Sequence, residues 1–587
     1  MKIIGLKFFG HDCSVCMIDT EKKELFAISS ERVTRKKHDA SGIDSVVGEY
    51  RAMFAGANIY CHSFDKFETS SSTAIEHWEY CRGNINKWYK TNGDTIKFVL
   101  GSLLYGIERI PFNLGYCRHI KRVSREITKR SIVNSFRCKN EYITFAEHHL
   151  CHAFSAYYTS KYINKKALVV TLDGYGDGCF SKAYIFDKKE VLQVGMSAAD
   201  PIYKKLTRLT NGVTSIGILY ENFTEALGLR RNSDEGKVEA LAAFGIPDAH
   251  LLESLLETTR VKFDGIKIDK RLVKKFYDIN YLKSIRTAIG DKNFAATIQR
   301  YLETVVCDYI YVLGSRYPDV DHLCLAGGVA ANIIMNLAIY EKTRFRNVHI
   351  CPAMGDDGTA LGAAIYTAVS NGQEIGFIQN MHMPYFGDSI ADSDVTREAD
   401  IRGLSCVELK EDWCKVAADD ITSGKIIAVV QGRMEFGPRA LGNRSIIADP
   451  RDPNIKTKIN STVKRRPEYQ PFCPSILEED RVTLFEDSFS HKHMAIAFRM
   501  RDKYREIFPG ATHIDGTARP QFVSKEDNYY YWNLLKEVKD RIGIGIVINT
   551  SFNLHGRTIV RTAKDAIDDF LDCGIDVLYI NGIRITR

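Results

Sequence analysis

Two histidines, His148 and His152, lie four residues apart in a stretch with a helical pattern of apolar residues. At this spacing two side chains stand one above the other on one helix face, with Cβ atoms about 5–6 Å apart, so both imidazoles can bind one cation. Asp173 and Asp356, at the ends of predicted strands, supply carboxylates. Such a set with open positions suits Fe²⁺, its usual occupant, with Mn²⁺ and Zn²⁺ as alternatives. These four residues predict a divalent metal site, against the alternative of two packed helix histidines.

Glycine-rich turns follow two predicted strands and suit phosphate groups. Gly174 lies in the turn 173–178, while Gly327 and Gly328 begin a turn that reaches Asn332 and opens a helix. Glycine lets backbone N–H groups approach an anion, and a helix N-terminus favours negative charge. The chain has neither G-x-x-x-x-G-K-[ST] nor G-x-G-x-x-G, so those two nucleotide-binding modes are excluded. We expect ATP to bind by another mode, with Mg²⁺ as an option beside it.

One unit of sequence occurs twice in the N-terminal half. Strand 3–8, a polar turn from Gly10, strand 15–18 and a charged turn occur first. Strand 167–172, turn 173–178, strand 183–186 and a charged turn repeat the order. Two such hairpin units separated by helical sequence predict a duplicated α/β fold with a cleft between its halves. This layout resembles that of the actin-like, ribonuclease-H-like ATPases.

The length of 587 residues predicts at least two domains. We expect a first domain over 1–371, a linker rich in Gly, Pro, Asp and Ser over 372–393, and a second α/β domain over 394–587, with strands at 426–430, 544–548 and 577–580. Fifteen cysteines without regular spacing indicate reduced thiols. No apolar run is long enough to cross a bilayer and the N-terminus does not read as a signal peptide, so we expect a cytoplasmic protein without a membrane partner.

The stretch from Arg433 to Arg466 is strongly basic. Nine Lys or Arg oppose three Asp or Glu there, a net charge of +6. An anionic ligand would dock on such a stretch, and the alternative is a solvated basic surface.

Long motifs in this order resemble the O-carbamoyltransferases of nodulation-factor and antibiotic biosynthesis. They extend along nearly the whole chain, so agreement by chance is excluded in practice. The matching segments are Gly10-His11-Asp12, residues 30–39, Glu147 to His152, residues 234–238, 326–330, 355–362, 434–446, 515–519 and 549–553.

The resemblance implies two active sites in one chain. The first domain is similar to the actin-like enzyme that modifies tRNA with threonylcarbamoyl groups, and the second to its YrdC-like partner. In the family, the second domain makes carbamoyl-adenylate from carbamoyl phosphate and ATP. The first domain then transfers the carbamoyl group to a hydroxyl of a small molecule or glycan.

The family pattern also implies roles for individual residues. His11 matches the acceptor-site histidine, which would remove the hydroxyl proton as a general base. Lys37 matches the nucleotide lysine. Arginine and lysine neutralise phosphate, and amides and hydroxyls past a strand end can hold the carbamoyl group, although Asn and Ser also favour turns. The second-domain site is expected to use Arg439, Arg444, Ser445, Lys464, Arg519, Asn549, Ser551 and Asn553.

Two positions depart from the pattern. Arg557 stands where the family has an acid, and Gln470 replaces an arginine, which puts anion contacts in that loop in doubt. A tRNA-modifying enzyme and an ATP-binding scaffold without transfer chemistry are the alternatives. The basic residues coincide with the Gly437-Pro438-Arg439 motif, so we expect no nucleic-acid partner. The acceptor is left open, as is assembly into a homodimer.

Overall fold

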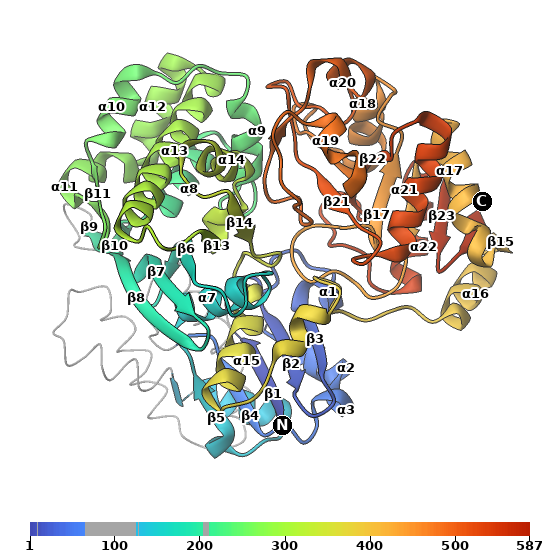
Figure 1. Ribbon diagram of the computed structural model, residues 1–587, viewed down its shortest axis with the longest axis horizontal. Coiled ribbons are helices and arrows are strands. Elements are labelled where there is room, and N and C mark those ends of the chain that lie inside the picture. Colours follow the sequence, from blue (N-terminus) through green and yellow to red (C-terminus); the bar gives the residue numbers. More distant parts are fainter. Residues whose placement is uncertain (9, 41, 65–124, 127, 204–209) are drawn as a thin grey trace.

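A computed structural model describes residues 1–8, 10–40, 42–64, 125–126, 128–203 and 210–587 (Figure 1). The first sheet has the order β3-β2-β1-β4-β5. Strand β1 pairs antiparallel with β2 and parallel with β4, and β5 extends the parallel side. The strands are β1 (Lys2–Lys7), β2 (Ser14–Asp19), β3 (Glu24–Ser29), β4 (Ile59–His62) and β5 (Ile143–Phe145).

The second sheet repeats the first strand for strand. Written in the same sense as the first sheet, its order is β8-β7-β6-β13-β14. Strand β6 is antiparallel to β7 and parallel to β13, as β1 is to β2 and β4. The same order and the same strand directions in both sheets confirm the predicted duplication and the actin-like class of the first domain. These strands are β6 (Ala167–Gly176), β7 (Cys179–Asp187), β8 (Glu190–Ala198), β13 (His322–Ala326) and β14 (Asn347–Ile350).

Two helices join the duplicated halves. Helices α7 (His148–Tyr158) and α15 (Gly358–Ser370) pack on each other, and α15 also packs on β1. A Cβ at Gly362 would lie 1.7 Å from the carbonyl oxygen of Cys151, and one at Gly5 would lie 1.9 Å from that of Ala360. Glycine at these two positions therefore allows the close approach of α15 to α7 on one side and to β1 on the other. The Glu147 side chain caps α7 by accepting from the amide of Leu150 at 2.8 Å.

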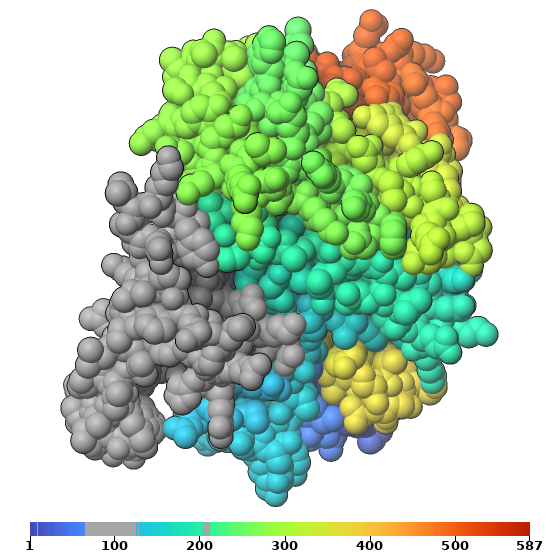
Figure 2. All heavy atoms as spheres, turned by 90° about the vertical axis from the view of Figure 1, so that its left-hand side faces the viewer, coloured from blue at the N-terminus to red at the C-terminus, as the bar shows by residue number. Residues whose placement is uncertain are grey.

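A layer of helices covers the second half on the side away from the first sheet. In Figure 2 these green residues fill the upper part of the face, above the teal strands. They are α8 (Ile216–Ala226), α9 (Glu235–Ala242), α10 (Ala249–Leu256), α11 (Lys270–Val273), α12 (Ile279–Ile289), α13 (Asp291–Arg316) and α14 (Ile333–Lys342). Within the described residues, no helix combines the length and apolar character needed to cross a membrane.

The second domain is an eight-stranded mixed sheet with helices on both faces. Alternate residues of β16 and β23 enter two different cores, one formed with α16 and α22 and the other with α17 and α21. The order is β15-β24-β23-β16-β17-β22-β18-β21. The α/β class is as predicted, while the YrdC-like identity stays a prediction. The bounds are α16 (Asp392–Ile401), β15 (Ser405–Glu408), α17 (Trp413–Thr422), β16 (Ile427–Val430), β17 (Arg444–Ala448), β18 (Cys473–Leu477), β21 (Gln521–Val523), α21 (Tyr529–Ile542), β22 (Ile546–Ser551), α22 (Ala563–Leu571), β23 (Val577–Ile580) and β24 (Ile583–Thr586).

The segment predicted as a linker packs against the first sheet. The Phe386 carbonyl accepts from the amide of Ala27 at 3.1 Å, and Arg433 donates to the carbonyl of Leu25 at 2.8 Å. The chain between α15 and α16 contains a short 3₁₀ helix, Gly376–Asn380. The stretch is therefore tied to the first domain by one backbone hydrogen bond, and the side chain of Arg433, which lies after the stretch, bridges the carbonyls of Phe386 and Leu25.

Candidate functional site

The four residues predicted as metal ligands meet in one place, and we call them the His–Asp quartet: His148, His152, Asp173 and Asp356. The helix α7 presents both imidazoles, β6 presents Asp173, and the turn before α15 presents Asp356. Each residue offers one ligand atom, and the four atoms lie within 4.8 Å of one another. His148 Nε2 is 2.9 Å from Asp173 Oδ2, and His152 Nε2 is 3.5 Å from Asp356 Oδ1.

The charges of the quartet are matched within the buried site. Burial raises the pKa of Asp173, but the hydrogen bond with His148 and the charges of both histidines overcome this and hold it well below its usual value. Burial lowers the pKa of His152, but the two carboxylates raise it by more, to about 9. Lys7 forms an ion pair of 3.0 Å with the other oxygen of Asp356. Its buried charge supports the ionised form of that carboxylate.

The quartet fits a divalent cation. His152 Nε2 is buried and has no hydrogen-bond partner among the described residues, although two carboxylates surround it. A buried nitrogen without a partner costs free energy, which a bound cation would recover. Neutral imidazole nitrogens and carboxylate oxygens are the donor set that Fe²⁺, Mn²⁺ and Zn²⁺ accept. The predicted ligands therefore have the right chemistry and the right neighbours for such an ion.

The Gly327-Gly328 turn lies directly beside the quartet, whereas Gly174, predicted in a turn, lies within β6 next to Asp173. The amide of Gly328 donates to Asp173 Oδ1 at 3.0 Å. Gly327 has φ of +94°, and a Cβ there would lie 2.1 Å from the carbonyl oxygen of Leu172. The turn can thus pass β6 only because residue 327 has no side chain. Asn332 lies farther along and caps α14, because its Oδ1 accepts from the amide of Met335 at 2.9 Å.

His11 lies on the first hairpin turn, as predicted. Its Nδ1 is 2.8 Å from Asp12 Oδ2. Burial lowers the pKa of His11, but the hydrogen bond and charge of Asp12 raise it by more, to about 10. The side chain is 40% exposed, so water screens part of this interaction. A proton on His11 is therefore held more tightly than on a free histidine.

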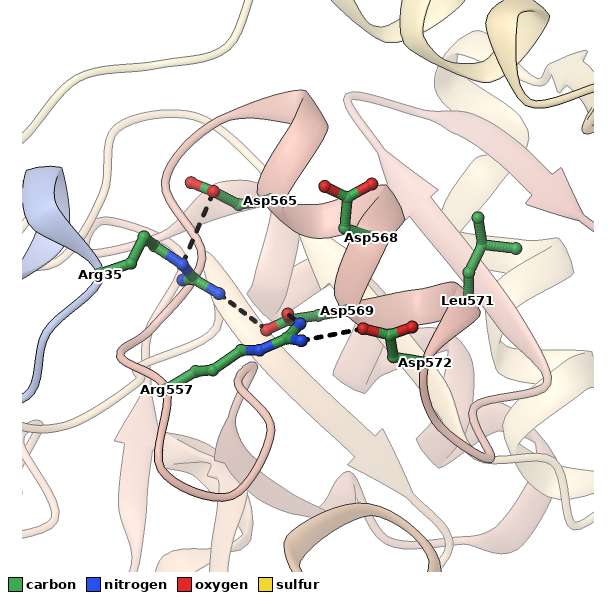
Figure 3. Close-up of a pocket in the computed structure, with 7 residues that line it drawn as sticks. All are labelled: Arg35, Arg557, Asp565, Asp568, Asp569, Leu571 and Asp572. Atoms are coloured by element: carbon green, nitrogen blue, oxygen red, sulfur yellow. Dashed lines mark hydrogen bonds and ion pairs between the residues drawn. The ribbon is translucent and has the colours of Figure 1, made fainter.

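The loop that carries the predicted nucleotide lysine is anchored to the second domain. Lys37 itself is exposed. Two residues before it, Arg35 donates to Asp569 Oδ2 at 2.9 Å and to the carbonyl of Thr558 at 2.7 Å. Arg557 holds the other oxygen of Asp569 from the opposite side, so one carboxylate lies between two guanidinium groups (Figure 3). Arg557, the departure from the family pattern, thus forms ion pairs at the domain boundary.

Four cations of the second domain lie close enough to affect one another, and we call them the basic cluster: Arg439, Lys464, Arg466 and Arg519. Burial lowers the pKa of Arg466 to about 10, and the charges of Arg439 and Arg519 contribute. Burial and the charge of Arg466 hold the pKa of Lys464 well below its usual value. Among the described residues, no carboxylate forms an ion pair with Arg439, Lys464 or Arg466. The nearest approach of an acid is Glu239, 3.4 Å from Arg519.

The polar residues after β22 contact this cluster. Lys464 donates to the carbonyl of Ser551 and, at 2.9 Å, to Asn553 Oδ1. Asn549 donates to Ser475 at 3.0 Å, while its own Oδ1 is buried without a partner among the described residues. The Nε atoms of Arg439 and Arg519 are also buried without a hydrogen-bond partner among the described residues. Donors and one acceptor that lack partners thus gather around the cluster.

Arg444 and Ser445 have structural contacts in place of the predicted ligand contacts. Arg444 is completely buried, and its guanidinium donates to the carbonyls of Gln431, Gly432 and Asn443 at 3.1, 3.2 and 2.7 Å. Ser445 Oγ accepts from the amide of Gly442 at 2.9 Å. Both residues stabilise the loop before β17, and Arg444 has no exposed surface to offer an anion.

Sequence analysis did not assign three residues of these sites. Arg466 was counted only in the basic stretch, and Lys7 was given no role. A lysine at the end of a buried strand was the available signal for Lys7. Glu221, on α8, lies beside Gly174 and forms an ion pair of 3.0 Å with Arg231. Burial raises the pKa of Glu221 to about 7, and nothing in its sequence neighbourhood signals this.

Comparison with known proteins finds two family models that match successive parts of the chain. The family model described as carbamoyltransferase N-terminus matches residues 2–365, and carbamoyltransferase C-terminus matches residues 418–587. An uncharacterized protein of Methanocaldococcus jannaschii is 44% identical over the whole of both chains. Nodulation protein NolNO of Sinorhizobium fredii is 33% identical, over 76% of this chain and 64% of its own.

An enzyme with a named activity is also similar. The 3'-hydroxymethylcephem-O-carbamoyltransferase of Streptomyces clavuligerus is 29% identical, over 60% of this chain and 64% of its own. The two family models match in order along most of the sequence and include the quartet and the basic cluster. This chain therefore belongs to the carbamoyltransferase family.

Proposed function

We propose that this carbamoyltransferase is an ATP-dependent O-carbamoyltransferase. Its second domain forms carbamoyl-adenylate from carbamoyl phosphate and ATP. Its first domain transfers the carbamoyl group to a hydroxyl of a small molecule or glycan and releases AMP. The similar cephem enzyme and nodulation protein support a biosynthetic acceptor of this kind.

The basic cluster is the observation that carries this proposal. Several buried cations repel one another, and burial already depresses the pKa values of Lys464 and Arg466. An anion that carries several charges removes this repulsion and supplies acceptors for Arg439 and Arg519. Carbamoyl phosphate and the phosphates of ATP provide such charges, and the amide of Asn549 suits a carbamoyl group. The cluster thus fits strongly anionic substrates.

The first domain provides the groups for transfer. A divalent ion held by the His–Asp quartet would offset the charge of nucleotide phosphate oxygens. The Gly327-Gly328 turn and Lys37 would hold the nucleotide beside it. His11, on the opposite hairpin turn, would take the proton of the acceptor hydroxyl. This arrangement separates the chemistry of adenylate formation from that of transfer.

Separate sites can be tested with pre-formed carbamoyl-adenylate. Acceptors are first found with a mass-shift screen of hydroxyl compounds in the presence of carbamoyl phosphate and ATP. We expect AMP release to require both carbamoyl phosphate and the acceptor. The Arg439→Ala protein should be inactive with carbamoyl phosphate and recover with carbamoyl-adenylate, whereas His11→Ala should stay slower by about 10²–10⁴-fold with either donor.

Four results would contradict the proposal. AMP release that does not depend on carbamoyl phosphate would indicate a different donor. Recovery of the His11→Ala protein by carbamoyl-adenylate, or failure of both variants to recover, would indicate one shared site. Carbamoylation of tRNA with a steep loss of binding at higher salt would favour the nucleic-acid alternative.

A further inference from the structure

One carboxylate, that of Asp12, lies between two imidazoles in the first domain. Asp12 Oδ2 is 2.8 Å from His11 Nδ1, and Asp12 Oδ1 is 2.7 Å from His38 Nδ1. Asp12 and His38 have φ of +60° and +54°, in the left-handed region that residues other than glycine rarely adopt. Such backbone conformations persist only where the surroundings enforce them. The three side chains are therefore held together by two constrained turns.

The position of His38 is fixed from helix α1 (Ser30–Thr34). The His38 amide donates to Glu31 Oε2 at 3.0 Å, and the other oxygen of Glu31 accepts from Arg32 at 2.7 Å. The next residue, Asp39, accepts from the hydroxyls of Ser30 and Thr34 at 3.0 and 2.8 Å. His38 thus belongs to a rigid turn, and it directly follows the predicted nucleotide residue Lys37.

The pairing with Asp12 leaves one ring nitrogen of His11 for chemistry. Because Nδ1 is bound to Asp12, Nε2 is the atom that can reach a substrate, and the ring is partly exposed. Two further carboxylates influence His11 electrostatically, Asp356 from the turn before α15 and Glu221 from α8. Lys7, at the end of β1, opposes them. Asp12 is the one of these groups that forms a hydrogen bond with the ring.

One nearby acid, Asp357, interacts with the charge of Asp12. Asp12 and Glu31 raise the pKa of Asp357, the N-cap of α15, after the larger effect of burial. His38 is the second imidazole that balances Asp12. Burial raises the pKa of Asp12, but the hydrogen bonds from His11 and His38 overcome this and lower it. The two histidines therefore share the stabilisation of one negative charge.

We propose that Asp12 and His38 are positioning residues for carbamoyl transfer: Asp12 fixes the orientation and tautomer of His11, and His38 shares the Asp12 carboxylate, which weakens its hold on the His11 proton. This inference rests on the proposed function. It adds one requirement to general-base catalysis. His11 must carry its proton on Nδ1, bonded to Asp12, while Nε2 stays free of a proton.

The step that this geometry serves is balanced in atoms and electrons. The acceptor oxygen forms a bond to the carbamoyl carbon while its proton passes to Nε2 of His11. The bond between that carbon and the adenylate oxygen breaks, and AMP leaves with the electron pair. Nδ1–H remains hydrogen-bonded to Asp12 throughout, so the carboxylate stabilises the imidazolium that forms. Loss of the proton from Nε2 to water restores His11.

Removal of either partner should change the titration of His11 in opposite directions. Asp12→Asn keeps an acceptor but removes the charge, so the pKa of His11 should fall. His38→Ala leaves the Asp12 carboxylate to His11 alone, because Asp12 loses its second hydrogen-bond donor, so the pKa of His11 should rise. His38→Asn keeps an N–H donor for Asp12 and tolerates the left-handed backbone, so it should restore the wild-type value.

The titration can be measured without an acceptor. We suggest NMR of the full-length protein with ¹³C-labelled histidine, with the His11 signal assigned from the His11→Asn protein. His250→Ala, which removes an exposed imidazole on α10, is the control and should leave the His11 titration unchanged. Opposite shifts for Asp12→Asn and His38→Ala support the inference. Shifts in the same direction, or none, overturn it.

A kinetic measurement distinguishes positioning from general damage. With pre-formed carbamoyl-adenylate and an acceptor from the screen, kcat/KM should rise with pH above neutrality, because the unprotonated fraction of His11 grows. The rise should begin at lower pH in Asp12→Asn and at higher pH in His38→Ala. A uniform loss of rate at every pH would assign both residues a merely structural role. If the wild-type protein carbamoylates no hydroxyl at all while the NMR shifts appear, the proposed function fails and the pairing of the three residues stands.

Discussion

The His–Asp quartet and the basic cluster treat charge in opposite ways. In the quartet two carboxylates face two imidazoles and a lysine, so each charge has a partner inside the protein. In the basic cluster, cations face one another, and the acid nearest to it is 3.4 Å from one of its members. One site is balanced before a ligand arrives, whereas the other becomes balanced only with an anion.

This difference tells which residues serve binding and which serve the fold. Buried charges are tolerated when they are paired, and a surplus of one sign marks a place where a ligand completes the pairing. In the quartet, a cation would take the place of the proton on His152 Nε2, which has no hydrogen-bond partner among the described residues. The cluster needs several negative charges. The comparison therefore predicts a metal ion for the first domain and polyanionic substrates for the second.

The largest effect is expected at the basic cluster. Arg439→Ala should lower the carbamoyl-phosphate-dependent release of AMP by about 10³-fold, because a preorganised charged donor is lost from the site of the anion. Relief of repulsion should leave the unfolding temperature unchanged or higher. Arg451→Ala, in the same basic stretch but paired with Asp449 at 2.6 Å, is the control and should retain activity. Full activity of the Arg439→Ala protein would mean that the cluster does not bind the substrate.

The quartet should respond in metal content. His152→Ala should reduce bound transition metal from near one per chain to a small fraction, because the donor nitrogen without a partner is lost. Elemental analysis of the purified protein measures this. The control is His149→Asn on the same helix, since His149 bonds Thr171 and Cys179 and not the carboxylates. Equal metal content in the His152→Ala and wild-type proteins would show that the quartet is only a packing arrangement.

The smallest effect is expected where charges are balanced between the domains. Asp569→Asn should lower the free energy of unfolding by about 1.5–3 kcal/mol, because a buried acceptor of charged hydrogen bonds from Arg35 and Arg557 is lost. Activity with saturating substrates should change little. Asp572→Asn, whose carboxylate is 53% exposed, should cost less than about 1 kcal/mol. Chemical denaturation of the wild-type, Asp569→Asn and Asp572→Asn proteins measures these free energies of unfolding. An equal loss of stability in both variants would show that Asp569 has no special role.

The two hairpins and their repetition could be predicted from sequence because each hairpin is local. Strands 3–8 and 15–18 are joined by a polar turn of a few residues, and the same spacing recurs from residue 167, so the repeat appears along the chain. The pairing of the parallel strands β13 and β14 needs crossovers through helices, and no local pattern identifies it. Of the chain between Tyr50 and Glu141, residues 65–124 and 127 lie outside the described residues.

The spacing of His148 and His152 determined by itself that both imidazoles share one helix face. Only the tertiary structure decided which carboxylates meet them, because Asp356 is more than two hundred residues away and reaches the site through the packing of α15 on α7 and β1. Arg439 and Arg444 show the same limit at shorter range. Both lie in one basic motif, but pairing of β17 with β16 buries Arg444 among backbone carbonyls. Burial depends on which segments pack together, and it separates a structural arginine from one that can bind an anion.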